Sequence, residues 1–171
     1  MSKKCIYIWA KRRCSGTTLR ILCTALVAWG GYMLAPKSSD AGMTAPYIVR
    51  NDRGGDVETR AKQIQNLAAR QARVEIRGKH CLSSCTMFLG APDVCVSPGT
   101  RFGFHGPSDH GRPLPAHRFE YWSQVIAAHY PPNLAKWYME KARHLNHGYY
   151  FLTGEQLIQM GVRRCDEEIG P

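Results

Sequence analysis

Short apolar runs with strand character alternate with helical segments through the middle of the chain, and this alternation restricts the fold more than any other feature. Pro46–Asn51 and Val74–Ile76 have the apolar, β-branched character of buried strands. Between them, Val57–Ala72 carries apolar residues at helical spacing and charged residues on the opposite side. Further strand runs follow at Val94–Val96 and Arg101–His105. This order is typical of parallel βαβ units, so the sequence predicts an α/β domain.

The C-terminal part reads as mainly helical. Gly106–Pro115 is rich in proline and polar residues and is predicted to be a loop. Phe119–His129 and Leu134–Leu145 have helical patterns, separated by two consecutive prolines. A last short helix is expected to run from an N-cap at Thr153 to Met160.

Residues 1–41 differ from the rest and are set aside from the fold. Basic residues come first, and the uncharged apolar run Ile21–Ala35 follows them. This is the pattern of a secretory signal, with a small-residue cleavage site at Ser39–Ala41, or of an anchor that stays in the inner membrane. Either alternative places residues 42–171 outside the cytoplasm, in the periplasm, as a single domain.

The net charge of +10 comes largely from that leader. Residues 1–41 hold seven of the 23 Lys and Arg and one of the 13 acidic residues, which leaves 16 basic against 12 acidic residues, or +4. The rest of the chain has no basic stripe with interleaved aromatic residues, so we expect no nucleic-acid partner.

The candidate chemistry lies at a serine and a histidine. Ser84 falls between the run Val74–Ile76 and an apolar segment, Cys85–Leu89, that is predicted to be helical. Unpaired N–H groups at a helix start can stabilise an oxyanion there, although an N-cap role alone would also explain the serine. If Val74–Ile76 and Arg101–His105 lie in one parallel sheet, Ser84 and His105 fall at the same sheet edge.

Four cysteines remain outside the leader: Cys81, Cys85, Cys95 and Cys165. In an oxidising compartment they predict one or two disulfides, and the sequence leaves the pairing open. We expect Cys81 with Cys95 first, because they sit on or beside successive strand runs. Zinc held by Cys81, Cys85 and nearby histidines is the competing interpretation, but the second half lacks a close ligand pair, so we expect no metal and no other cofactor.

Four segments in order resemble one family. Residues 48–57 resemble the strand, Gly-Gly turn and helix start of the Clp protease proteolytic subunit and its crotonase-fold relatives. Residues 82–85 resemble the nucleophile turn of that family, and residues 94–107 its catalytic-histidine strand. Residues 151–162 resemble its closing helix. The chain is most similar to exported Clp-protease-like proteins of bacteria.

The resemblance implies a crotonase-like fold of stacked βαβ units and a serine-type peptidase. Ser84 would be the nucleophile and His105 its base, with Gly55 and Cys85 N–H groups as the oxyanion hole. Ser83 is the alternative nucleophile, less favoured because the family places its reactive serine second, directly before the larger residue. The acid that the family carries before its closing segment is missing, and Asn146, or Asp109 from the loop, would take its place behind the histidine.

Two functions follow from these expectations. The first is a serine hydrolase that acts on a peptide or protein substrate outside the cytoplasm. The second is an inactive envelope protein that keeps the fold for assembly or for binding a partner. Expected partners are the substrate, the inner membrane where residues 21–35 are retained, and further copies of the chain in a homo-oligomer.

Overall fold

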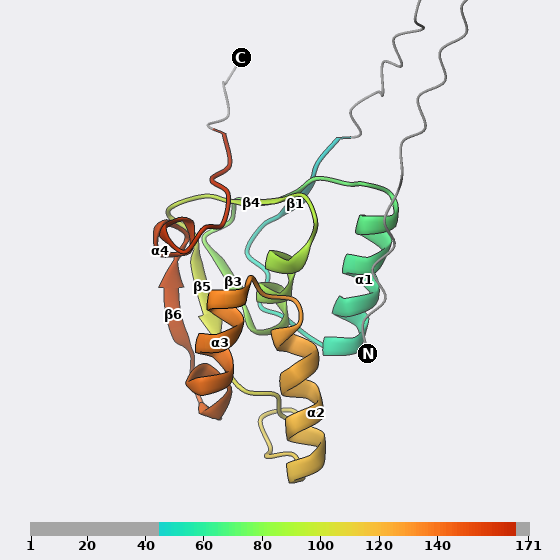
Figure 1. Cartoon of the computed structure of the whole chain (residues 1–171), viewed down its shortest axis with the longest axis vertical. Helices are drawn as coiled ribbons and strands as arrows, with labels where there is room; N and C mark the ends of the chain where they lie inside the picture. The colour runs from blue at the N-terminus through green and yellow to red at the C-terminus, as the bar shows by residue number, and fades with distance from the viewer. Residues whose placement is uncertain (1–44, 167–171) are drawn as a thin grey trace, which may run out of the picture. The chain divides into compact units, whose positions relative to one another are not determined.

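Three short parallel strands form the first of two sheets. The computed structural model describes residues 45–166, which belong to one compact unit (Figure 1). In the first sheet β1 (Tyr47–Val49), β2 (Val74–Ile76) and β4 (Val94–Val96) lie in the order β1-β2-β4. All three residues of the central strand β2 are buried, the apolar Val74 and Ile76 together with the charged Glu75 between them.

A second sheet contains β3 (His80–Leu82), β5 (Arg101–Phe104) and β6 (Tyr150–Thr153). β3 and β5 are parallel, whereas β6 is antiparallel to β5. The expectation that Val74–Ile76 and Arg101–His105 share one sheet is therefore wrong. The chain leaves β2, turns within three residues and opens the second sheet with β3. At the turn, a side chain on Gly78 would collide with the backbone of Asn51.

Within residues 45–166, four α-helices accompany the sheets. They are α1 (Val57–Ala69), α2 (Ala116–Ala127), α3 (Pro132–Glu140) and α4 (Gly154–Gln159). Asp56 caps α1 through the Thr59 N–H, and Thr153 caps α4 in a reciprocal capping box with Gln156, as the sequence predicts for Thr153. The helix α2 begins earlier than predicted, directly after Pro115, because proline suits a helix start.

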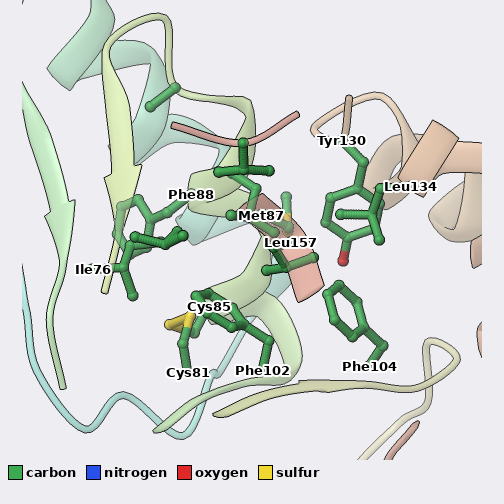
Figure 2. Packing of buried hydrophobic residues seen from close by; sticks show 14 of the residues in the cluster. Ile76, Cys81, Cys85, Met87, Phe88, Phe102, Phe104, Tyr130, Leu134 and Leu157 are labelled. Carbon is green, nitrogen blue, oxygen red and sulfur yellow. A yellow bond between two sulfur atoms is a disulfide. The ribbon is translucent and has the colours of Figure 1, made fainter. Parts of the chain in front are cut away.

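The segment after β3 is a short 3₁₀-helix, η1 (Ser83–Gly90), and a second one, η2 (Ala142–His144), follows α3. Every residue of η1 from Ser84 to Leu89 is buried. Met87 and Phe88 lie in the core with Ile76 and Leu157 (Figure 2). The mixed α/β class and the single described domain agree with the sequence prediction.

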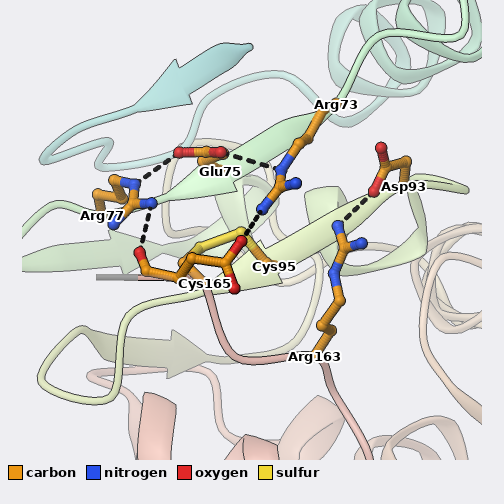
Figure 3. Close-up of a disulfide and its surroundings, with 8 residues drawn as sticks. Arg73, Glu75, Arg77, Asp93, Cys95, Arg163 and Cys165 are labelled. Carbon is orange, nitrogen blue, oxygen red and sulfur yellow. Dashed lines mark hydrogen bonds and ion pairs between the residues drawn. A yellow bond between two sulfur atoms is a disulfide. The ribbon is translucent and has the colours of Figure 1, made fainter. Parts of the chain in front are cut away.

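All four candidate cysteines form disulfides, but not in the expected pairing. Cys81 bonds to Cys85, four residues later, and Cys95 bonds to Cys165 (Figures 2 and 3). The expected Cys81–Cys95 pair is wrong because Cys81 lies on β3 and Cys95 on β4, in different sheets. Cysteines bonded in this way are not zinc ligands. Both disulfides are compatible with a location outside the cytoplasm.

The end of the described chain covers the outer edge of β4. The Cys165 N–H donates to the Val96 carbonyl, and the Val96 N–H donates to the Arg163 carbonyl. These bonds satisfy backbone groups that an uncovered edge strand would leave open.

Neither membrane span nor metal cluster is found in residues 45–166. No helix there is long and apolar enough to cross a bilayer. No group of three or more His, Cys, Asp and Glu side chains there is arranged to hold a metal ion. The predicted signal or anchor in residues 1–41, with its apolar run 21–35, lies outside the described residues.

Candidate functional site

A sharp turn between β3 and η1 presents Ser83. The backbone of Ser83 has a φ of 55°, in the left-handed region that residues other than glycine rarely adopt. The turn packs tightly against Gly54, where an added Cβ would come within 2.5 Å of the Ser83 Cβ. A left-handed residue between a strand and a helix projects its side chain away from both elements, as in known nucleophile turns.

Two further bonds hold this turn. The Cys81–Cys85 disulfide closes a loop around Ser83, and both cysteines are fully buried. Within η1, the Thr86 hydroxyl donates to the Ser83 carbonyl over 2.7 Å. The turn is therefore fixed on either side of the serine.

His105 reaches the same place from the second sheet. It follows directly after β5, and its Nε2 lies 2.7 Å from the Ser83 Oγ. The ring packs edge-on against Tyr149, with centroids 5.2 Å apart. Burial lowers the pKa of His105, and a hydrogen bond with the Gly106 backbone opposes that change. A lowered pKa favours the neutral ring, which is the form that accepts a proton.

The structure thus pairs Ser83, not the predicted Ser84, with His105. Ser84 is 2% exposed, and its Oγ has no hydrogen-bond partner. The reason is the backbone: Ser83 occupies the left-handed turn, whereas Ser84 begins the buried face of η1. The sequence shows two adjacent serines, and no local pattern reveals which of them takes the positive φ.

The predicted Gly-Gly turn lies beside this pair. Asp52 organises it, because one carboxylate oxygen accepts the Gly54 N–H at 2.7 Å and the other bonds Arg60 of α1 at 2.6 Å. Gly54 and Gly55 both have positive φ values, 92° and 153°, which glycine adopts without strain. An added Cβ on Gly55 would meet no atom within 4 Å, so this side of the turn faces open space.

The change from Ser84 to Ser83 also changes the expected oxyanion donors. Gly55 lines the cavity beside Ser83, as predicted. Cys85 is fully buried and is not among the residues that line the cavity. The donor that follows a nucleophile at Ser83 is the N–H of Ser84, which lines the cavity at the start of η1.

A cavity of about 550 Å³ opens over the Ser83–His105 pair. Its remaining walls come from the loop after His105 and from α2. Apolar side chains there include Leu114, Trp122 and Ile126, and Arg118 is charged, while Asp56 lines the cavity from the start of α1. The volume is large enough for a side chain and part of a peptide backbone.

The two candidates for a third catalytic group are not placed behind the histidine. Asn146 is exposed and lines a separate cavity with Leu114 and Glu120. Asp109 lies in the main cavity wall, but its carboxylate bonds His110 and Arg112. Within residues 45–166, no carboxylate is hydrogen-bonded to His105, whose ring contacts are the Ser83 hydroxyl and the edge of Tyr149.

Comparisons with known proteins give no family for this chain. No protein-family model matches the sequence, and no curated protein matches it. The geometry of Ser83, His105 and the Gly54–Gly55 turn therefore carries the functional argument.

Proposed function

We propose that this domain is a serine hydrolase of the Clp-protease-like, crotonase-fold class that acts on peptides or proteins outside the cytoplasm. The observation that carries the proposal is the 2.7 Å contact between Ser83 Oγ and His105 Nε2 at a left-handed turn beside a cavity. A nucleophile within hydrogen-bond reach of a base is the minimum that acyl transfer needs.

The groups fit the steps of an acyl transfer. Neutral His105 takes the proton of Ser83 as Oγ attacks the substrate carbonyl carbon, and the negative charge on the carbonyl oxygen is held by the Gly55 and Ser84 N–H groups. His105 then gives the proton to the leaving amine as the carbon–nitrogen bond breaks. Water repeats the sequence on the acyl-enzyme and releases the acid, which restores the Ser83 hydroxyl.

One observation favours a second candidate, an inactive envelope protein that binds a partner with this fold. It is the absence of a carboxylate hydrogen-bonded to His105 in the described part of the chain. A serine and histidine without an acidic third member keep part of the catalysis of a full triad, so we expect slow turnover by this domain.

Covalent labelling with a fluorophosphonate separates the two candidates. We expect the purified domain to label on Ser83, and Ser83→Ala and His105→Ala to lose labelling. Ser84→Ala is the matched control, because Ser84 is the adjacent buried serine without a partner. Peptide mapping of the adduct identifies the residue. A folded wild-type domain that takes up no probe would leave the binding protein as the better description.

A further inference from the structure

Two tyrosine hydroxyls from the region of α2 and α3 are linked by hydrogen bonds to the backbone carbonyls of Ser83 and His105. Tyr130 follows α2, and Tyr138 lies within α3. Tyr138 is fully buried and Tyr130 is 8% exposed. No step of the proposed reaction uses either phenol.

The link from Tyr130 to Ser83 passes through Thr86. The Thr86 Oγ1 lies 2.7 Å from the Ser83 carbonyl oxygen and 2.6 Å from the Tyr130 hydroxyl. A carbonyl can only accept, so the single proton of Thr86 is donated to Ser83. The Tyr130 hydroxyl must therefore donate to Thr86, and the three groups form one directed chain. It ends on the residue that has the left-handed backbone.

The link from Tyr138 to His105 is direct. Its hydroxyl donates to the His105 carbonyl over 3.3 Å. The two phenol rings also touch, with centroids 5.3 Å apart. Phe104, the neighbour of His105, packs edge-on against Tyr130 (Figure 2). One aromatic cluster is therefore linked to His105 directly and to Ser83 through Thr86.

These hydroxyls stay protonated. Burial raises the pKa of both phenols, so each remains a donor over the pH range in which proteins fold. The contacts join the helical region to two different places, the turn after β3 and the end of β5.

We propose that Tyr130, acting through Thr86, and Tyr138 are positioning residues that set the distance between Ser83 Oγ and His105 Nε2. This inference rests on the proposed hydrolase function. A change of about 1 Å in such a distance can lower a reaction rate roughly a hundredfold, so loss of one hydrogen bond has a measurable effect.

The test uses substitutions that remove only a hydroxyl. Tyr130→Phe and Tyr138→Phe are each expected to lower the fluorophosphonate labelling rate of Ser83 about tenfold, consistent with loss of one buried hydrogen bond. Thr86→Val should match Tyr130→Phe, and the double variant should lose little more, because both act in one chain. Thr86→Ser restores the hydroxyl and should recover most of the rate. Tyr121→Phe is the control, because Tyr121 lies on α2 and is 58% exposed.

A second measurement keeps the inference testable without activity. The ¹⁵N signal of His105 Nε2 in NMR reports its hydrogen bond to Ser83. We expect this signal to move toward that of a free imidazole in Tyr130→Phe and Tyr138→Phe, and to stay unchanged in Tyr121→Phe. Thermal unfolding of each variant shows whether the fold is intact.

The outcomes separate the two proposals. If the wild-type domain does not label, the hydrolase proposal fails, and the NMR signal alone decides whether the tyrosines hold the pair. The positioning role is wrong if the wild-type domain labels and both Tyr130→Phe and Tyr138→Phe label at the wild-type rate, with His105 Nε2 signals unchanged from wild type. Equal losses in Tyr121→Phe would also overturn it.

Discussion

The state of His105 at physiological pH depends on its surroundings. Its ring is partly buried between the Ser83 turn and Tyr149, and this burial lowers its pKa below the ordinary histidine value of about 6.5. A histidine with a lowered pKa loses its proton at a lower pH. His105 is therefore mainly in the neutral, proton-accepting form near neutral pH.

The pH profile of labelling tests this property. Because the neutral ring is the base, the labelling rate of Ser83 should rise with pH through the pKa of His105, with its midpoint below the ordinary histidine value of about 6.5. Rates measured between pH 4 and 8 on the wild-type domain give the inflection, with His105→Ala as the background. An inflection at or above 6.5 would mean that burial does not control this pKa.

For single residues, the sequence indicates a serine and a histidine as the reactive groups but does not show which of the two adjacent serines is used. The expectation that a serine and His105 meet rests on the family resemblance, since the single parallel sheet expected to bring them together is absent from the described residues. Which serine meets His105 depends on the left-handed backbone of Ser83, and that depends on the close approach of Gly54, nearly 30 positions earlier in the sequence. Local propensity contains no information about such a contact.

Among the elements, the two disulfides have different roles. Cys81–Cys85 connects the end of β3 to η1 and encloses Ser83. Cys95–Cys165 joins β4 to the C-terminal segment across 70 positions, at a distance from the Ser83 turn, and neither of its cysteines lines the cavity. A crosslink restricts the unfolded chain more when its loop is longer, about 2 kcal/mol for the short loop and about 4 kcal/mol for the long one.

Removing the long Cys95–Cys165 disulfide should therefore have the larger effect on stability, and removing the short Cys81–Cys85 disulfide the larger effect on labelling. Cys95→Ala with Cys165→Ala should lower the free energy of unfolding about twice as much as Cys81→Ala with Cys85→Ala. The second double variant should lose more of the Ser83 labelling rate, because its loop contains the serine. Urea unfolding and labelling kinetics on both proteins provide the comparison. The same order in both measurements would show that the short disulfide does not hold the site.

The prediction of elements missed two strands, His80–Leu82 and Tyr150–Thr153. Both lack the β-branched apolar residues that mark the equally short β1, β2 and β4, and β3 continues into η1 without a turn signal. η1 is buried on all sides between Ser84 and Leu89, so it has no polar face from which a period could be read. Longer segments with two distinct faces, such as α1, were predicted correctly apart from their ends.

Across the domain, a cluster of charged residues joins β2 to Asp166, the last residue that the structure describes. Glu75, 8% exposed, bonds Arg73 at 2.9 Å and Arg77 at 2.6 Å. Both arginines also bond Asp166. Arg73 contacts the Asp166 carboxylate, and Arg77 donates to the Asp166 backbone carbonyl. Figure 3 shows the cluster beside the Cys95–Cys165 disulfide. A buried carboxylate between two guanidinium groups is costly to replace, because the positive charges lose their compensation.

Glu75→Gln should lower the free energy of unfolding by about 2 kcal/mol, since it keeps the shape and removes the charge from one hydrogen bond, with Arg77, and from one ion pair, with Arg73. The control is Glu58→Gln, which breaks an exposed pair with Lys62 and should leave stability almost unchanged. Urea unfolding at neutral pH measures both. Equal effects would show that the cluster contributes no more than a surface pair.

Long-range arrangement is what the sequence left most open. The α/β class follows from the alternation of strands and helices, but the split into two sheets follows from a turn at Gly78 that packs against Asn51. The disulfide pairing depends on that split, because it separates Cys81 from Cys95. Four cysteines allow three pairings, and only the sheet arrangement selects among them.

The distance between Cys95 and Cys165 along the chain has a consequence for the order of oxidation. If the chain crosses the membrane N-terminus first, Cys165 emerges 70 positions after Cys95, near the end of the domain. The thiols of Cys81 and Cys85 are accessible to Cys95 before that. Closing a short loop is entropically easier than closing a longer one, so Cys81 and Cys85 find each other first. Once the Cys81–Cys85 disulfide has formed, neither of these thiols can pair wrongly with Cys95, which remains reduced until Cys165 is available.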